Sequence, residues 1–146
     1  MIRLLNWFRA DETVETVLEL DLDSLSAQGK CALLFDLDNT LEPGRPQALR
    51  QTTKTFLLGL LARGFRVGVL SNRRFLSEEA RRALHLEGVP MAFHAGKPRK
   101  KEYCRLLRQL GAQTEDAVFV GDRRLTDTFG ARRTGLSCIR VRRPMP

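Results

Sequence analysis

The chain has 146 residues and a formal net charge of +8; 42% of its residues are hydrophobic and 29% are charged. These proportions are close to the globular average, which excludes a disordered chain and a fibre, and the length suits one domain with one core. No apolar run approaches the roughly 20 residues that a membrane span needs. We therefore expect a cytoplasmic protein with one domain over residues 1–146, divided into an N-terminal arm and lead-in (1–29) and a core (30–146).

The charge is unevenly distributed along the chain. Residues 1–42 carry nine acidic and three basic side chains, a net charge of −6, whereas residues 43–146 carry eight acidic and 22 basic ones, a net charge of +14. Such a basic excess favours an anionic partner: nucleic acid, an acidic membrane surface or a phosphorylated substrate. Arginines that merely decorate solvated faces would give the same excess, so the charge alone leaves the partner open.

The first nine residues are amphipathic if they are helical. Met1, Leu4, Leu5 and Phe8 would then share one face. Polar residues interrupt this stretch, so it lacks the continuous apolar run of a secretory signal. The segment fits either an arm that packs on its own domain or an interfacial membrane anchor. The arm is favoured, because so short a helix is marginally stable alone.

Short apolar runs alternate with helix-length amphipathic segments along the rest of the chain. The runs are typical of strands buried on both faces, and they cover residues 31–36, 65–71, 89–93, 117–122 and 137–141. The intervening helices are expected from Pro46 to Gly64, from Leu76 to His85, from Pro98 to Gly111 and from Leu125 to Thr134. This alternation predicts an α/β fold: one three-layer Rossmann-like domain with an open, parallel, five-stranded sheet and helices on both faces.

Polar residues follow four of the predicted strands. In open parallel sheets, ligands bind beyond the carboxyl ends of the strands. The residues at those ends are Asp36, Asp38 and Thr40 after the first strand, Ser71 and Asn72 after the second, Lys97 after the third, and Gly121, Asp122 and Asp127 at the fourth. Four carboxylates in one place repel one another unless cations compensate. Oxygen ligands favour a hard divalent ion, so we expect Mg²⁺ beside Lys97.

Four short motifs resemble those of a known superfamily. The stretch FDLDNTL (35–41), Ser71-Asn72, Lys97-Pro98 and GDRRLTD (121–127) is similar, in order and spacing, to the motifs of the haloacid dehalogenase (HAD) phosphohydrolases. The longer phrase GDRRLTDTFGARRTG resembles most closely the capless subfamily IIIA, which includes YqeG-type phosphatases and phosphatidylglycerophosphate phosphatases. The resemblance implies a HAD-like fold without a cap domain.

The resemblance also implies a role for each acidic residue. Asp36 would be the nucleophile that takes up the phosphoryl group as an aspartyl phosphate. Asp38 would protonate the leaving group and then activate water. Asp36, Asp122, Asp127 and the backbone carbonyl of Asp38 would hold Mg²⁺, with Asp127 bound directly or through water.

The remaining motif residues are implied to serve the phosphoryl group. Ser71 and Asn72 would donate hydrogen bonds to its oxygens, and Lys97 would offset the charge that develops on them. An ordinary turn role for Asn72 remains open. Thr40 and Gly121 would support the site.

The short intervals between motifs leave no room for a lid. Residues 41–70 and 72–96 are each used up by one helix and one strand, so we expect an open mouth suited to a phosphomonoester on something large. Basic residues would surround that mouth, namely Arg45, Arg73, Arg74 and Arg123, with Arg99, Lys100, Lys101 and Arg124 nearby. A lipid phosphate such as phosphatidylglycerophosphate, met by peripheral contact with the inner face of an anionic membrane, is the favoured substrate.

Three other functions are weighed against the lipid phosphatase. A phosphatase acting on nucleic-acid or protein phosphate fits the charge, although no aromatic residues interleave the basic loops to stack on bases. A phospho-receiver module shares the sheet and the aspartates, but its acceptor lies on a later strand. A silent binding domain is disfavoured because every chemical position is filled.

Overall fold

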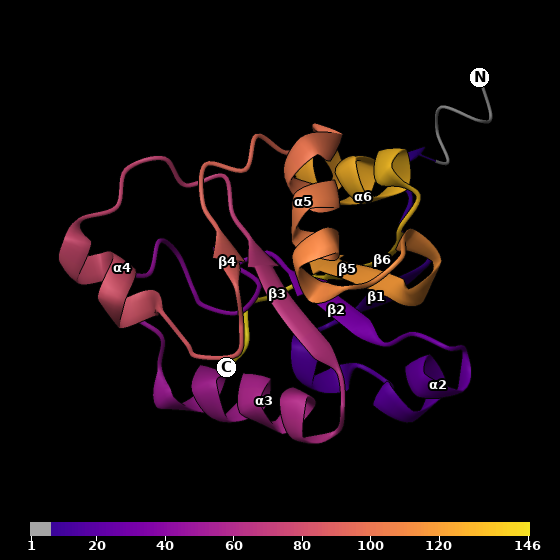
Figure 1. The fold of residues 1–146 in the computed structure, drawn as a ribbon, viewed down its shortest axis with the longest axis horizontal. Coiled ribbons are helices and arrows are strands. Elements are labelled where there is room, and N and C mark those ends of the chain that lie inside the picture. The colour runs from indigo at the N-terminus through magenta and orange to yellow at the C-terminus, as the bar shows by residue number, and fades with distance from the viewer. Residues whose placement is uncertain (1–6) are drawn as a thin grey trace.

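The structure is a computed structural model that describes residues 7–146 of the chain (Figure 1). Its centre is a parallel sheet of six strands in the order β1-β6-β5-β2-β3-β4. The strands are β1 (Glu12–Val14), β2 (Ala32–Phe35), β3 (Arg66–Leu70), β4 (Met91–Ala92), β5 (Ala117–Gly121) and β6 (Ser137–Val141). The helices are α2 (Leu22–Ala27), α3 (Gln51–Ala62), α4 (Glu78–Leu84), α5 (Lys100–Leu110) and α6 (Phe129–Thr134), with the short turns η1 (Val17–Glu19), η2 (Thr114–Asp116) and η3 (Arg124–Thr128).

The predicted parallel α/β class is confirmed, but the predicted number of strands is wrong. The sixth strand, β1, pairs with β6 through Glu12 opposite Ile139 and Val14 opposite Val141. Only one of its three side chains is buried. Its position at the sheet edge is therefore specified by backbone hydrogen bonds rather than by an apolar run, which is why the hydrophobic pattern did not reveal it.

Alternate side chains of the central strands enter two separate cores. Leu33 and Phe35 of β2 pack in the core beneath α2 and α3, whereas Ala32 and Leu34 pack in the core beneath α5 and α6. Figure 1 shows these two helix layers on opposite sides of the sheet. Because successive residues of a strand point to opposite faces, the fully apolar sequence of β2 follows from burial on both.

Helix α3 begins five residues later than Pro46, where the sequence predicted its start. Arg50 is the last non-helical residue, and both its backbone NH and its side-chain Nε donate to the buried carboxylate of Glu42, at 3.2 and 2.9 Å. Thr53 also donates to that carboxylate. The loop before α3 is therefore held by polar anchors that outweigh the helix signal of Pro46.

The C-terminal tail is fastened to the same loop. The backbone NH of Met145 donates to the carbonyl of Thr40 at 3.0 Å, and the guanidinium of Arg50 donates to the carbonyl of Met145 at 2.8 Å. The side chain of Met145 is buried in the core on this side of the sheet. The loop after β2 is thus fixed from two directions.

Most of the predicted amphipathic segment 1–9 lies outside the described residues. Of the part that is described, the ring of Phe8 stacks on Phe129 at the start of α6, 4.9 Å between centroids, and Trp7 lies 5.6 Å from the same ring. These two residues therefore pack on their own domain. Among residues 7–146, no helix has the length and apolarity needed to cross a membrane.

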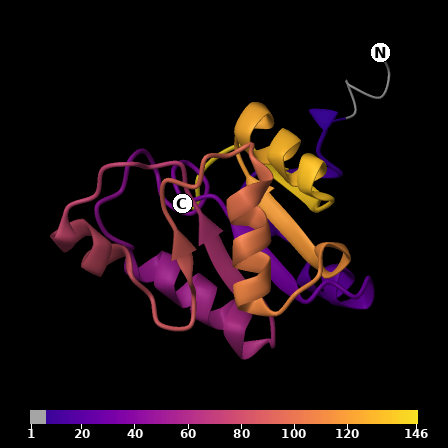
Figure 2. The same ribbon diagram turned by 45° about the horizontal axis from the view of Figure 1, so that its top comes forward.

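Within residues 7–146, no further domain covers the carboxyl ends of the central strands. One helix, α3, connects β2 to β3, and one helix, α4, connects β3 to β4. As the 45° turn in Figure 2 also shows, the connections after these strands are loops that run beyond the sheet. The expectation of a capless domain is confirmed.

Candidate active site

Three carboxylates meet one lysine at the carboxyl ends of β2 and β5. The ammonium group of Lys97 lies 2.8 Å from Asp36 Oδ1 and 2.7 Å from Asp127 Oδ1. Asp36, Asp122 and Asp127 each offer a carboxylate oxygen within 4.8 Å of the others. Residues from three distant segments of the sequence therefore converge at the strand ends, as the strand-end argument predicted.

Burial shifts the pKa values of the charged groups in this cluster. Loss of solvation raises the pKa of Asp36 to about 6, with Asp122 adding to the rise and the Lys97 ammonium opposing it. Burial likewise raises the pKa of Asp127, again against the effect of Lys97. The two carboxylates in turn hold the pKa of Lys97 above its ordinary value, outweighing the cost of burying the cation. The lysine is thus a charged, shared partner of two acids.

Gly121 makes room for one of these acids. A Cβ atom on Gly121 would lie 2.5 Å from Asp127 Oδ2 and 2.7 Å from Asp127 Cβ. Any other residue here would displace the carboxylate, so the glycine is required by close approach rather than by backbone conformation. Asp127 itself is fully buried in η3, where its second oxygen accepts from the backbone NH of Arg123 at 3.0 Å.

Asp38 lies on a tight loop beside the cluster. Its neighbour Asn39 has a left-handed backbone (φ 61°) and accepts through its side chain from the NH of Gly44 at 2.9 Å. The half-buried carboxyl of Asp38 has a raised pKa because of burial, which the charge of Arg73 counteracts most. Asp38 is outside the group of three carboxylates, and no described residue donates a hydrogen bond to its buried Oδ1. Thr40 is fully buried behind it.

Ser71 and Asn72 have different surroundings. Ser71 is buried beside the cavity, and its hydroxyl accepts from the backbone NH of Arg73 at 3.2 Å. The side chain of Asn72 instead binds the backbone of Lys97, donating to its carbonyl at 3.0 Å and accepting from its NH at 2.8 Å. Asn72 therefore positions the backbone of Lys97 in this structure. The sequence does not indicate this role, because the two residues are far apart along the chain.

A cavity of about 310 Å³ opens above the carboxylates. It is lined by Asp36, Asp38, Asn39, Gly44, Arg45, Ser71, Asn72, Arg73, Lys97, Arg123 and Thr126. Three of these residues were not predicted as site residues, although Asn39 and Thr126 lie inside the motifs at 35–41 and 121–127 and Gly44 follows the first of them.

The arginines predicted to surround the mouth differ in their exposure to solvent. Arg45 and Arg123 are exposed and line the cavity, and Arg74 is exposed outside it. Arg73, however, is buried, and its guanidinium donates to the carbonyl of Pro46 in the loop before α3. Arg73 thus connects two strand-end loops beside the acidic cluster.

The donor set fits a hard divalent cation. Three oxygens within 4.8 Å of one another come from carboxylates, the ligands that Mg²⁺ prefers. The buried Oδ1 of Asp122 contacts no hydrogen-bond donor among the described residues. A buried carboxylate oxygen without a donor is costly, and a cation at this position would satisfy it.

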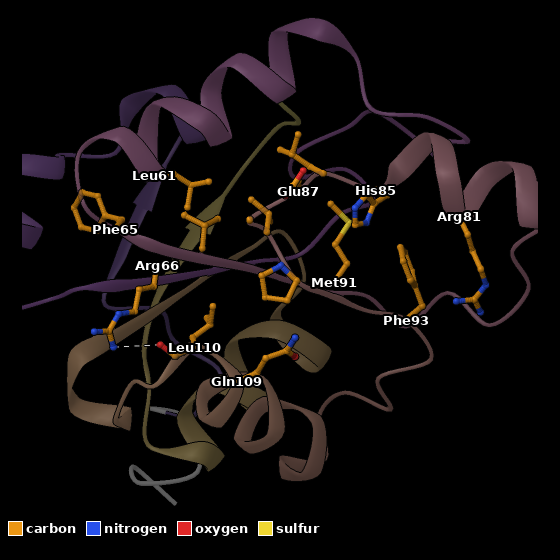
Figure 3. Close-up of a pocket in the computed structure, with 15 residues that line it drawn as sticks. Leu61, Phe65, Arg66, Arg81, His85, Glu87, Met91, Phe93, Gln109 and Leu110 are labelled. Atoms are coloured by element: carbon orange, nitrogen blue, oxygen red, sulfur yellow. Dashed lines mark hydrogen bonds between the residues drawn. The ribbon is translucent and has the colours of Figure 1, made fainter.

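A larger cavity, of about 860 Å³, lies beside the edge strand β4, between the start of β3 and Phe93 (Figure 3). Leu61, Phe65, Met91 and Phe93 give it apolar walls. Arg66, at its border, donates to the carbonyl of Gly111 at 2.6 Å. No cluster of metal-binding side chains was found in this cavity among residues 7–146. Size alone therefore does not identify the site of chemistry.

An acidic cluster with a paired lysine, at the carboxyl edge of a capless parallel sheet, defines a phosphatase-type α/β hydrolase, and comparisons with known proteins agree. A family profile described as HAD-hydrolase-like matches residues 94–143. The probable phosphatase YqeG of Bacillus subtilis is 33% identical over 141 residues, which cover 94% of this chain and 79% of the relative. The chain therefore belongs to the HAD superfamily, among the YqeG-type phosphatases.

Two further relatives are informative. The chloroplastic phosphatidylglycerophosphate phosphatase 1 of Chlamydomonas reinhardtii is 31% identical over 132 residues; these cover 86% of this chain but only 49% of that protein, so the chain spans about half its length. The crystal structure of a haloacid dehalogenase-like hydrolase from Brucella suis superposes with a TM-score of 0.60 at 14% identity, covering 88% of this chain and 94% of the other. The latter similarity shows the fold.

Proposed function

We propose that this phosphatase hydrolyses phosphomonoesters with Mg²⁺ through an aspartyl-phosphate intermediate. The single observation that carries the proposal is the shared contact of Lys97 with Asp36 and Asp127, beside a third carboxylate whose oxygen lies within 4.8 Å of theirs. This arrangement places one nucleophilic carboxylate next to fixed positive charge at the floor of a cavity. Asp122 and Asp127, with Asp36, would hold the metal.

In the first step, an oxygen of Asp36 attacks phosphorus. The bond from phosphorus to the alkoxide of the substrate breaks, and Asp38 donates its proton to that alkoxide. The raised pKa of Asp38 favours the protonated carboxyl that this step needs. In the second step, Asp38 takes a proton from water, the water oxygen attacks phosphorus, and phosphate leaves as Asp36 returns to a carboxylate.

Fixed donors stabilise the charge on the phosphoryl oxygens during both steps. The Lys97 ammonium lies against Asp36, where the transferred group would be, and the Ser71 hydroxyl is buried at the cavity wall. Mg²⁺, when bound, offsets the repulsion between the carboxylates and the phosphoryl group. Asn72 contributes by holding the backbone of Lys97.

The proposed substrate is a lipid phosphate, such as phosphatidylglycerophosphate, met at an anionic membrane. The cavity has no covering domain, and Arg45 and Arg123 border it. An open, cationic mouth suits a phosphate borne on a surface. The similarity to a phosphatidylglycerophosphate phosphatase supports the same substrate class.

A phosphatase that acts on nucleic-acid or protein phosphate is the second candidate. The exposed cations at the mouth favour it equally, because phosphate backbones attract the same side chains. A turnover panel separates the candidates: phosphatidylglycerophosphate in detergent micelles, 3′- and 5′-phosphorylated oligonucleotides, a phosphopeptide and a sugar phosphate.

We expect turnover of the lipid to exceed that of the others and to stop with EDTA. Recovery of activity with added Mg²⁺ would confirm the metal. Preferential hydrolysis of an oligonucleotide or phosphopeptide would overturn the lipid assignment, and full activity in EDTA would overturn the metal assignment.

A further inference from the structure

Two large apolar side chains are exposed on either side of the active-site mouth. Phe75 is 90% exposed and follows the cavity-lining Arg73 by two residues, in the loop between β3 and α4. Leu125 is 62% exposed and lies in η3 between Arg123 and Thr126, both of which line the cavity. A single exposed apolar residue needs no explanation, but two that flank one catalytic mouth suggest a function for that surface.

The apolar pair stands among unpaired cations. Seven basic residues of the strand-end loops and helix starts are exposed and form no ion pair within residues 7–146: Arg45, Arg74, Arg99, Lys100, Lys101, Arg123 and Arg124. We call these seven the cationic collar. By contrast, several basic residues elsewhere, such as Arg63, Arg132 and Arg142, are paired with carboxylates of their own domain. The collar is thus available to a partner with negative charge.

The loop that contains Phe75 and the turn that contains Leu125 both lie beyond the carboxyl ends of the strands. Figures 1 and 2 both show the segment between β3 and α4 running beyond the ends of the strands. Leu125 precedes α6 by a few residues. The rings of Trp7 and Phe8 pack against Phe129, the first residue of that helix. Trp7 is itself 44% exposed. Trp7 is therefore a further exposed apolar side chain packed at the start of the helix that follows Leu125.

We propose that the mouth is a membrane-docking surface, with Phe75 and Leu125 entering an anionic bilayer while the cationic collar contacts its lipid phosphates. This inference rests on the proposed lipid phosphatase function. A bilayer offers negative charge at its surface and apolar chains a few ångströms deeper, which matches cations and protruding apolar side chains on one face. Docking in this orientation brings the cavity over the headgroups, so a phosphomonoester reaches Asp36 without leaving the membrane.

A nucleic acid matches only half of this surface. Its phosphates would bind the collar, and the ring of Phe75 could stack on a base. The aliphatic side chain of Leu125, however, gains little from a stacked, polar base edge, whereas it is stabilised by transfer into hydrocarbon. The observations therefore favour the bilayer.

Vesicle co-sedimentation tests the proposal with the full chain. One set of vesicles contains phosphatidylcholine with about 30% phosphatidylglycerol, which gives the membrane a negative surface potential. The other set contains phosphatidylcholine alone. The test variants are Phe75→Gln, Leu125→Gln and Arg74→Gln. The control is Leu58→Gln, which removes an apolar residue that is 46% exposed from α3, on a helix that covers one face of the sheet.

We expect binding to the anionic vesicles, with a loss of about tenfold for each apolar substitution and about fivefold for Arg74→Gln. The losses from the apolar substitutions should persist at high salt, whereas the loss from Arg74→Gln should shrink. Leu58→Gln should bind like the wild type. All four variants should hydrolyse a soluble aryl phosphate at the wild-type rate, because none of these residues lines the cavity.

Several outcomes would overturn the docking surface. They are equal losses for Leu58→Gln and Phe75→Gln, unchanged binding for both apolar variants, or no vesicle binding by a wild type that binds oligonucleotides. Hydrolysis of the lipid in micelles without vesicle binding would overturn docking and keep the lipid phosphatase. Vesicle binding with the expected losses but no hydrolysis of the lipid would support docking and overturn the proposed substrate.

Discussion

Two cavities of the described residues differ in chemistry: one opens at the carboxyl ends of β2 and β3, and the other lies beside the edge strand β4, and the acidic cluster adjoins the smaller one. The larger, of about 860 Å³, has mainly apolar walls, whereas the smaller, of about 310 Å³, has three aspartates, a buried lysine and arginines at or near its floor and rim. Both cavities are lined by segments that are distant in sequence, but the carboxylates and the buried lysine converge only at the carboxyl ends of the strands among residues 7–146. A site is therefore recognised by convergent charged groups, not by volume.

The largest expected effect comes from Asp36→Asn. Loss of the proposed nucleophile should reduce turnover on the order of 10⁴-fold or more, while Lys97 keeps its contact with Asp127 and the fold persists. Steady-state assays with a soluble aryl phosphate and circular dichroism measure the two quantities. Asp23→Asn, which changes an exposed aspartate near α3, is the control and should stay within twofold. Wild-type turnover by Asp36→Asn would remove the distinction between the two cavities.

The next effect is a dependence of stability on pH in the metal-free protein. Burial raises the pKa of Asp36 from 3.8 to about 6, so the folded state binds this proton more tightly than the unfolded chain. The stabilisation that protonated Asp36 gives to the folded state is complete below pH 3.8 and is lost as the pH rises through about 6. The free energy of unfolding therefore decreases by at most about 3 kcal/mol over this range.

Denaturant titrations in EDTA at several pH values measure this decrease. The quantity to compare is the difference between the wild type and Asp36→Asn, because the carboxyl groups distant from the cluster contribute equally to both, whereas the difference reports Asp36 and its coupling to Asp122, Asp127 and Lys97. We expect Asp36→Asn to be the more stable of the two at neutral pH, with the difference vanishing in acid. Parallel profiles would contradict the charged, buried cluster.

A smaller effect is expected for Gly121→Ala. The new Cβ would meet the Asp127 carboxylate at 2.5 Å, so the free energy of unfolding should fall by about 2 kcal/mol through overpacking, and turnover should fall with it. The matched control is Gly59→Ala, which introduces a methyl group on α3 with no atom within 4 Å and should stabilise the helix by about 0.5–1 kcal/mol. Equal results for the two glycines would refute the close approach.

The smallest effect is expected in the larger cavity. His85→Ala removes an exposed side chain from its border, and we expect turnover within twofold and a change in stability within about 0.5 kcal/mol. The same aryl phosphate assay and thermal unfolding provide the measurements. A large loss of turnover would mean that the two ends of β3 are coupled.

The convergence of the acids could be predicted from the sequence because it follows from topology. Apolar runs locate β2 and β5, and parallel pairing then brings Asp36 and Asp122 to one edge whatever the details of the loops. The same reasoning misses β1, where only Val14 is buried. It also misplaces the start of α3, because the buried carboxylate of Glu42 binds Arg50 and no hydrophobic period reports such an anchor.

Side-chain orientation was the least predictable part of the site. The sequence places Arg73 next to Ser71, and this position fits a solvated rim cation as well as a buried one. The structure buries it because the carbonyl of Pro46, from a different loop, accepts from its guanidinium. Asn72 similarly finds its partner 25 residues away in the backbone of Lys97. Such contacts depend on loop geometry that local patterns do not encode.

The fastening of Met145 gives the C-terminal tail an influence on catalysis. Its backbone NH binds the carbonyl of Thr40, two residues after Asp38, and its own carbonyl binds Arg50. Removal of residues 145 and 146 would therefore release a loop that carries Asp38, the proposed proton donor. Turnover measured on a chain shortened in this way would show how much the proposed chemistry depends on that anchor.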